Sequence, residues 1–228
     1  LADGRLWFTM TEVRGRTLTE VIKDAHRDGP TGGWPLRRLI DILARVCEAM
    51  AYAHAQGVVH RDLKPDNLMI GEFGEALVMD WGLARRLDAG PDADGGPDTD
   101  DVLPEPQLTR AGQVMGTPMT MAPEQARGDR AAMSTATDVY ALGVVLYRTL
   151  TARWPYDGDP WTVMQRVAAA DPPIPLGERA GVYEIPEELA VLCHRAMDPE
   201  PYARLQHAGE LLVGLREWLD GARRHEAA

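Results

Sequence analysis

The chain has 228 residues, 45% of them apolar, which suffices for one large domain or two small ones with a sizeable buried core. Its net charge of −11 comes largely from residues 88–105, where seven acids occur without a base, so the sequence argues against a basic face that binds nucleic acid. No apolar run reaches the roughly 18 residues of a membrane span, and Cys47 and Cys193 lie too far apart for a zinc or redox motif, which indicates a cytoplasmic protein with buried, reduced thiols.

The first expected elements are a strand and a short helix. Residues 6–13 are aromatic, β-branched and apolar and stop before Gly15, a pattern that predicts a strand. Residues 19–26 predict a short helix, which Gly29 and Pro30 end.

A long helix is predicted from Leu36, because apolar residues recur at helical spacing as far as Met50. Pro35 is expected just inside the start of this helix, where its missing N–H costs nothing. Gly57 is expected to end it.

A hairpin and a polar loop are expected next. The apolar stretches 68–70 and 76–79 flank residues 71–75, which predicts two antiparallel strands joined by a turn. Residues 88–106 contain four prolines and three glycines besides the acids, so they are predicted to form a mobile, disordered loop. No register in this loop offers both the sixth-position glycine and the twelfth-position glutamate of a calcium site.

Helices dominate the rest of the prediction. Apolar residues share one face over residues 139–150 and again over residues 211–219. The sequence therefore predicts an α+β domain that is mainly helical, with a few short strands near its start. Most histidines are expected to be surface or helix residues without a chemical role: His26, His54, His194, His207 and His225.

The polar side chains crowded into residues 57–70, GVVHRDLKPDNLMI, indicate a specific chemistry. In such a loop Asp62 can accept a proton from an attacking hydroxyl, Lys64 can neutralise a phosphoryl group, and the amide oxygen of Asn67 can bind a metal ion. Asp80 follows thirteen residues after Asn67, on the far side of the predicted hairpin. The hairpin would turn both residues toward one magnesium site for phosphoryl transfer.

Taken together and in order, the motifs of the chain resemble those of a eukaryotic-type, bacterial Hanks-type serine/threonine protein kinase. The motifs are HRDLKPDN for the catalytic loop, DWG for the magnesium-binding D-F-G, GTPMTMAPEQ for the end of the activation segment, DVYALGVVLYRTLTARWPY for the central helix, and DPEPYARL for the motif with a buried arginine. The resemblance covers essentially all of the chain. It implies a protein kinase-like fold, with residues 1–15 as the last N-lobe strand and hinge and residues 16–228 as the C-terminal lobe, whose activation segment spans residues 80–124.

The resemblance also implies ATP and Mg²⁺ as cofactors. Asp62 would be the catalytic base, and Lys64 would contact the γ-phosphate, which marks a serine/threonine kinase. Asn67 and Asp80 would hold magnesium. The residues expected around adenine are Met10 as gatekeeper, Thr11 and Val13 through their backbone groups, and Met69 as the floor under the ring.

Regulatory and structural roles are implied as well. Arg61 would clamp a phosphate on the activation loop, with Thr109 as the best single acceptor, and Thr117 would hydrogen-bond near Asp62 and Lys64. The residues with implied structural roles are His60 stacked on Trp81, Asp138 as the anchor of both, and Glu124 in a buried ion pair with Arg204.

Some positions depart from the family pattern. Trp81 stands where phenylalanine is usual, Thr120 stands where tyrosine is usual, and two extra residues precede Arg204, which puts its pairing with Glu124 in doubt. No glycine-rich loop, strand lysine or helix glutamate occurs before residue 13, and the first residue is Leu1. The resemblance therefore implies a piece of a longer kinase whose partners are protein substrates with Ser/Thr hydroxyls and its own missing N-terminal lobe.

Other readings of the same sequence stay open. The chain could be a non-catalytic, kinase-like binding module or a lone lobe that scaffolds a partner. The intact catalytic set argues against the binding module. Membrane tethering, if any, would come from segments outside this chain.

Overall fold

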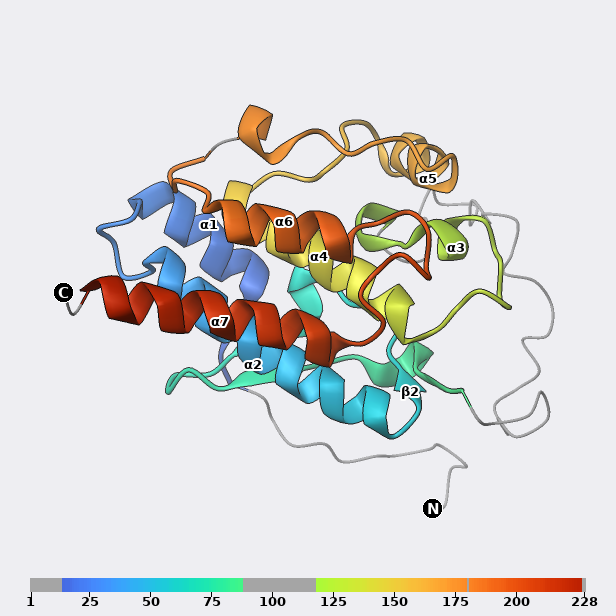
Figure 1. The fold of residues 1–228 in the computed structure, drawn as a ribbon, viewed down its shortest axis with the longest axis horizontal. Coiled ribbons are helices and arrows are strands. Elements are labelled where there is room, and N and C mark those ends of the chain that lie inside the picture. The colour runs from blue at the N-terminus through green and yellow to red at the C-terminus, as the bar shows by residue number, and fades with distance from the viewer. Residues whose placement is uncertain (1–13, 88–117, 180, 227–228) are drawn as a thin grey trace, which may run out of the picture.

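The computed structural model describes residues 14–87, 118–179 and 181–226. Its helices are α1 Leu18–Asp28, α2 Leu36–Ala55, α3 Pro123–Ala126, α4 Thr135–Thr151, α5 Pro160–Ala168, α6 Glu187–Ala196 and α7 Ala208–Glu226. Its strands are β1 Arg16–Thr17, β2 Val58–Val59, β3 Leu68–Ile70, β4 Ala76–Val78 and β5 Arg85–Arg86. Helices dominate the described residues and the strands are short and early, as the sequence predicted (Figure 1).

Helix α1 forms where the sequence predicted a short helix and is slightly longer. Thr17 caps its start through a capping box with Glu20, in which each side chain receives a hydrogen bond from the other residue's backbone N–H. Gly29 follows its end with a φ of +73°, a conformation that glycine adopts without strain.

Helix α2 confirms the long helix predicted from Leu36. The prediction for Pro35 was off by one position, because Pro35 is the N-cap with extended backbone and lies just before the first helical residue. Its fixed φ suits that position equally well. The helix ends at Ala55, and Gly57 follows two residues later with a φ of +71°.

Helix α4 forms the centre of the domain. The sequence predicted one apolar face for it, but nearly all of its residues are buried, polar ones included. It lies between α2, α6 and α7 (Figure 1), which bury all of its residues except Thr135 and Arg148; these two are half-buried. Gly143 makes the close approach of α6 possible, because a Cβ there would lie 2.7 Å from the Met197 side chain.

Two small antiparallel sheets position the polar loop. The predicted hairpin forms between β3 and β4, with Leu68 opposite Val78, and β1 pairs with the other edge of β3. A second sheet pairs β2 with β5, with Val59 opposite Arg85. Residues 60–67 lie between β2 and β3, and residues 79–84 lie between β4 and β5. Because β3 pairs with β4 and β2 pairs with β5, the two segments are held together at both of their ends.

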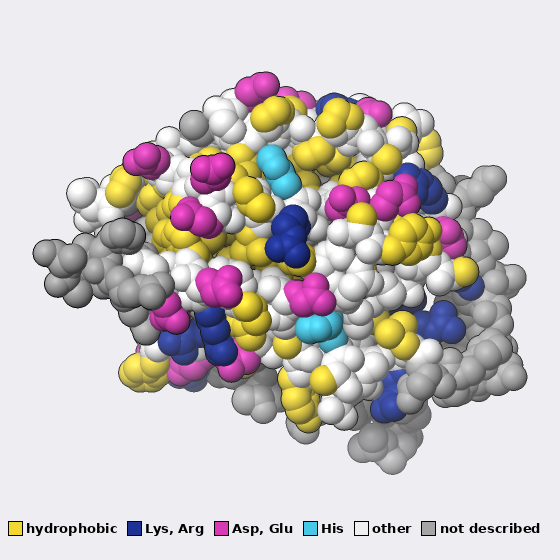
Figure 2. Space-filling view, in the orientation of Figure 1, with side chains coloured by type: hydrophobic (Ala, Val, Ile, Leu, Met, Phe, Trp, Pro, Cys, Tyr) yellow, Lys and Arg dark blue, Asp and Glu magenta, His cyan; other side chains and the backbone are white. Residues whose placement is uncertain are grey.

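Some predictions fall outside the described residues. These are the strand at residues 6–13 with Met10, Thr11 and Val13, the acidic loop at residues 88–106, and Thr109 and Thr117. In the described part of the chain, no helix has the length and apolarity that a membrane crossing requires. On the face shown in Figure 2, basic side chains are scattered among acidic ones.

Candidate active site

The loop of residues 60–67 is held by a buried carboxylate on α4. Asp138 is 1% exposed and accepts hydrogen bonds from the backbone N–H of His60 and from that of Arg61, both at 2.8 Å. Arg61 has a φ of +69°, a left-handed conformation that a side chain with a Cβ disfavours. Asp138 therefore offsets local backbone strain at the residue directly before Asp62.

His54 on α2 completes this anchor. Its Nε2 lies 2.9 Å from Asp138 Oδ2, and its Nδ1 accepts the backbone N–H of Ala208 at 3.1 Å. Because a backbone N–H can only donate, Nδ1 is the acceptor and Nε2 carries the proton that Asp138 accepts. His54 thus connects the start of α7 to the loop through Asp138.

The sequence predicted that His54 is a surface or helix residue without a chemical role; it lies in helix α2, and the structure adds that it is buried and supports the loop through Asp138. The His54 side chain is only 2% exposed, and both ring nitrogens are hydrogen-bonded. The sequence spacing could have predicted its burial. His54 follows the buried residues Cys47 and Met50 by seven and four positions, so it shares their face of the helix.

Asp62, Lys64 and Asn67 converge in the structure. Lys64 Nζ donates to Asp62 Oδ2 at 2.8 Å, and Asn67 Nδ2 donates to the backbone oxygen of Asp62 at 2.9 Å and to its Oδ2 at 3.2 Å. The carboxylate of Asp62 is partly exposed, with 14% of the side-chain surface accessible. It is fixed in orientation and still open to a substrate.

The hairpin brings the segment of Asp80 to the same place. The backbone N–H of Met79 donates to the carbonyl oxygen of Asn67 at 2.8 Å. Asp80 is therefore the residue directly after one that contacts the loop. Asp80 is exposed and has a φ of +61°. Asn67 uses its NH₂ group on Asp62, which leaves its Oδ1 as an acceptor.

These two residues fit a magnesium site by their chemistry. Magnesium prefers oxygen ligands, and proteins commonly supply one or two of them while water and phosphate oxygens complete the shell. An amide oxygen and an exposed carboxylate are such a pair. Among the described residues, no cluster of three His, Cys, Asp or Glu side chains forms a site for a metal ion.

The rings of His60 and Trp81, for which the resemblance implies stacking, are in contact in a tilted arrangement. Their ring centroids are 4.7 Å apart at an interplanar angle of 60°. His60 Nε2 donates to the carbonyl oxygen of Met79 at 2.9 Å, since its Nδ1 accepts the backbone N–H of Asp62 at 3.2 Å. The ring of Trp81 remains 40% exposed, so it lies at the rim of the site rather than inside the core.

Arg61 reaches the segment that follows Asp80. Its Nε donates to the carbonyl oxygen of Leu83 at 2.6 Å, and its own carbonyl oxygen accepts from Gln125 Nε2 at 2.8 Å. Arg85, which the sequence reasoning did not single out, lies opposite Val59 in the β2–β5 pair. The sequence feature that could have drawn attention to Arg85 is its position three residues after the DWG motif.

The Glu124–Arg204 pair forms despite the two extra residues before Arg204. Both oxygens of Glu124 are bonded, at 2.9 Å to Nη1 and at 3.1 Å to Nη2. Thr137 Oγ1 donates to Glu124 at 2.9 Å, and Arg204 Nη1 also donates to the carbonyl oxygen of Ala136 at 2.8 Å. The pair ties residues 118–126 to the start of α4.

Met69 lies in β3 and is half-buried, opposite Leu77 of β4 and Thr17 of β1. Thr120, the other departure from the family pattern, is 4% exposed and lies in the turn before Glu124.

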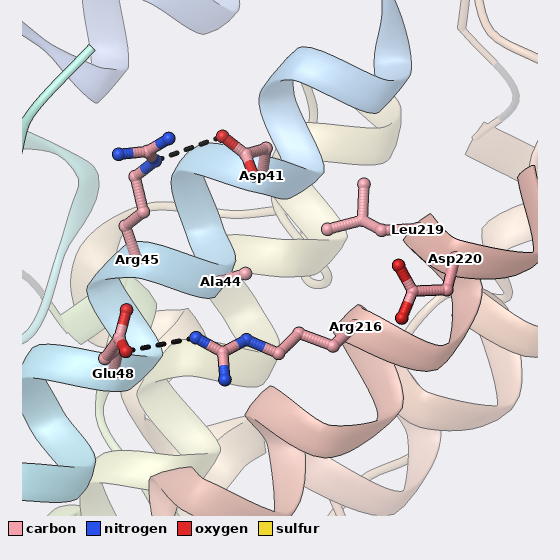
Figure 3. A pocket seen from close by; sticks show the side chains of 7 residues that line it. All are labelled: Asp41, Ala44, Arg45, Glu48, Arg216, Leu219 and Asp220. Atoms are coloured by element: carbon pink, nitrogen blue, oxygen red, sulfur yellow. Dashed lines mark hydrogen bonds and ion pairs between the residues drawn. The ribbon is translucent and has the colours of Figure 1, made fainter. Parts of the chain in front are cut away.

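A separate cavity opens between α2 and α7, away from these residues (Figure 3). Its charged side chains pair with one another: Arg45 with Asp41 at 3.0 Å and Arg216 with Glu48 at 3.0 Å. None of the residues predicted for phosphoryl transfer lines it.

Comparison with known proteins identifies the family of this chain. The model of the protein kinase domain family matches residues 2–212. The serine/threonine-protein kinase PknD of Protochlamydia amoebophila is 32% identical over 224 residues, which cover 94% of this chain and 22% of that protein. PknB of Mycolicibacterium smegmatis is 34% identical over 209 residues, covering 92% of this chain and 30% of that protein, and PknD of Chlamydia caviae is 32% identical over 228 residues, covering 95% and 23%.

The chain spans less than a third of the length of these relatives, all of which carry the name serine/threonine-protein kinase. The family match covers most of the chain and includes the anchored loop, the hairpin and the buried ion pair described above. The chain belongs to the protein kinase family.

Proposed function

We propose that this chain supplies the catalytic loop and the magnesium ligands for transfer of the γ-phosphoryl group of ATP to Ser or Thr hydroxyls of proteins. The observation that carries the proposal is the carboxylate of Asp62, fixed by Lys64 and Asn67 on a loop that Asp138 anchors. Phosphoryl transfer depends mostly on positioning and charge stabilisation, and this loop provides both.

The residues divide the work as follows. Asp62 orients the substrate hydroxyl and accepts its proton as the oxygen bonds to phosphorus and the bond from phosphorus to the leaving phosphate breaks. Lys64 balances charge beside Asp62 and offers donors to the transferred group. Asn67 and Asp80 would hold magnesium, which would neutralise phosphate charge.

An N-terminal lobe is part of the proposal. The chain contains two lysines, Lys23 and Lys64, and neither lies in residues 1–13, where it could approach the α- and β-phosphates from a strand. We assign the contacts to adenine to Met10, Thr11, Val13 and Met69, and the remaining phosphate contacts to a lobe that precedes them. The free, buried thiols of Cys47 and Cys193 suit a cytoplasmic location.

Regulation follows from the same arrangement. Arg61 directly precedes Asp62 and donates to Leu83 beyond the DWG motif, and Arg85 follows on β5. A phosphate on residues 88–117, with Thr109 as the favoured acceptor, would find these cations near the catalytic loop. Thr117 would hydrogen-bond near Asp62 and Lys64.

A transfer assay tests the proposal. A protein that joins an ATP-binding lobe to residues 1–228 should phosphorylate Ser and Thr but not Tyr in a generic protein substrate. Residues 1–228 alone should give no measurable transfer, because nothing covers the phosphates. An extended protein that binds Mg-ATP yet transfers no phosphate would favour the non-catalytic alternative.

Asp80→Ala should abolish magnesium-dependent ATP binding in the extended protein. The exposed carboxylate lies one residue beyond the contact with Asn67 and supplies the charged ligand of the pair. Glu72→Ala is the matched control, since Glu72 is an exposed acid at the opposite end of the same hairpin. Calorimetry with Mg-ATP measures both. Equal losses of Mg-ATP affinity in the two variants would refute the assignment of Asp80 as a magnesium ligand.

A further inference from the structure

Gln125 in α3 is a half-buried side chain to which the proposed reaction has so far given no role. Its Oε1 accepts the backbone N–H of Ala122 at 3.1 Å, and its Nε2 donates to the carbonyl oxygen of Arg61 at 2.8 Å. Since an N–H can only donate and a carbonyl oxygen can only accept, the two partners fix which way the amide of Gln125 points. Gln125 thus links the start of α3 to the residue directly before Asp62.

The hydrogen bond from Gln125 falls on the peptide unit that leads into Asp62. The N–H of this unit, which belongs to Asp62, donates to Nδ1 of His60 at 3.2 Å, so both polar groups of the unit have partners. Because a peptide unit is planar, these two hydrogen bonds fix its plane and the position of the Asp62 Cα. The preceding unit is held by Asp138, which accepts the N–H of Arg61 at 2.8 Å. Arg61 therefore keeps its φ of +69° between two fixed planes.

The other end of this link belongs to a well-anchored part of the domain. Ala122 is buried, and Glu124, directly before Gln125, is buried in its ion pair with Arg204. Gln125 is the third residue of α3, a position from which a Gln side chain can reach back to the N–H of the residue before the helix. Its oxygen is used there, which leaves its NH₂ group to reach Arg61.

The two partners of Gln125 require a side chain that both accepts and donates. An ionised carboxylate of the same length can accept from Ala122 but would place negative charge against the carbonyl oxygen of Arg61. An apolar side chain of similar size offers neither hydrogen bond. Without its donor, the Arg61 carbonyl would turn toward another partner, because an unpaired polar group is costly, and Asp62 would move with it. Such a movement lowers the rate of a reaction that depends on positioning.

We propose that Gln125 is a positioning residue for phosphoryl transfer, which holds the peptide unit between Arg61 and Asp62 and so couples the fold of residues 118–126 to the carboxylate of Asp62. This inference rests on the proposed function, because it concerns the base of that reaction. Gln125 acts through the backbone of the loop and needs no contact with substrate. Its loss should therefore lower kcat and spare ATP binding, since Asp62 serves the attacking hydroxyl and not the nucleotide.

Steady-state kinetics of the full-length protein with a generic Ser/Thr substrate test the inference. At mildly alkaline pH, Gln125→Leu and Gln125→Glu should each lower kcat roughly tenfold, the effect expected for losing one hydrogen bond that orients the base. The KM for ATP and the affinity for Mg-ATP measured by calorimetry should change by less than about twofold, because the lost interaction does not touch the nucleotide.

The pH dependence of Gln125→Glu separates positioning from a general structural defect. A protonated carboxyl carries one donor and one acceptor, as an amide does, so it can restore both hydrogen bonds of Gln125. Partial burial and the nearby carbonyl oxygen of Arg61 should raise the pKa of the introduced carboxyl above its usual range. The kcat of Gln125→Glu, divided by that of the parent at the same pH, should therefore rise as the pH falls from about 8 to about 5.5, whereas the ratio for Gln125→Leu should stay constant.

Gln206→Leu is the matched control, because Nε2 of Gln206 also donates to backbone carbonyls, those of Pro201 at 3.0 Å and Arg204 at 2.6 Å, in the exposed turn before α7. Its kcat should equal that of the parent at each pH. A parent protein that transfers no phosphate would overturn the proposed function and this inference with it.

The other adverse results concern the inference alone. A parent-like kcat in Gln125→Leu, or a loss that appears only as weaker ATP binding, would overturn it. A ratio for Gln125→Glu that does not rise toward low pH would overturn it as well. If Gln125→Leu does not fold, the pH dependence of Gln125→Glu still decides, because that variant keeps the shape of the parent side chain.

Discussion

Asp62→Asn lowers kcat by about 10²–10⁴-fold, the usual cost of losing a general base, while nucleotide affinity stays nearly unchanged. The substitution can keep the hydrogen bonds that hold the side chain of residue 62. Lys64 and Asn67 both donate to Oδ2 of Asp62, and an asparagine oxygen at that position can accept the same hydrogen bonds. The loop should keep its shape and lose only the capacity to take a proton.

Steady-state kinetics with a complete kinase that contains this domain measure the effect, beside calorimetry with Mg-ATP. Asp41→Asn provides the control, since Asp41 is a surface carboxylate on α2 that forms an ion pair with Arg45 in the same helix. Turnover close to that of the parent would refute the assignment of Asp62. A loss that appears only as weaker ATP binding would refute it as well, because it would place Asp62 at the nucleotide.

The local features of the site could be predicted from the sequence. Asp62, Lys64 and Asn67 lie within six residues of one another, so their convergence needs only a compact loop. The approach of Asp80 needs only the hairpin, which the turn residues between two apolar stretches indicate. Short-range geometry is fixed by few dihedral angles, and sequence patterns report on it directly.

The long-range features could not be predicted in the same way. His54 bonds to Asp138 and to Ala208, which lie 84 and 154 residues away in the chain. Its polarity suggested exposure, and only the packing of α2 against α4 and α7 buries it. The burial of nearly all of α4 has the same origin, because an apolar stripe shows which face of a helix is buried first but not how many neighbours the helix will have.

The ion pair of Glu124 and Arg204 shows where an inferred spacing misleads. Two extra residues before Arg204 made the pair doubtful, but a surface turn absorbs them. Residues 199–203 fold into a turn in which Ala203 N–H donates to Glu200 O, and Tyr202 is 83% exposed. An insertion in an exposed turn costs little, since it displaces no core residue. The guanidinium keeps its position because Asp198 O accepts its Nε at 2.8 Å.

Glu124→Ala should therefore destabilise the domain by about 3–5 kcal/mol, the range for removing one partner of a buried pair. The side chains of Glu124 and Arg204 are 1% and 0% exposed, so the variant leaves a positive charge without water or a counter-ion. It also leaves Thr137 Oγ1 without its acceptor. The double variant Glu124→Ala, Arg204→Met removes the stranded charge and should recover a large part of the loss.

Urea unfolding of the full-length protein, followed by a probe that reports on this domain, measures these changes through the midpoint at constant slope. Glu48→Ala is the matched control, because Glu48 forms an ion pair of similar length with Arg216, at 3.0 Å, but both side chains are more than half exposed. Its midpoint should barely move, since exposed ion pairs contribute little. If Glu124→Ala shifts the midpoint no more than Glu48→Ala, the buried pair does not stabilise the fold. If the double variant is less stable than Glu124→Ala, the loss comes from the packing of the arginine and not from its unpaired charge.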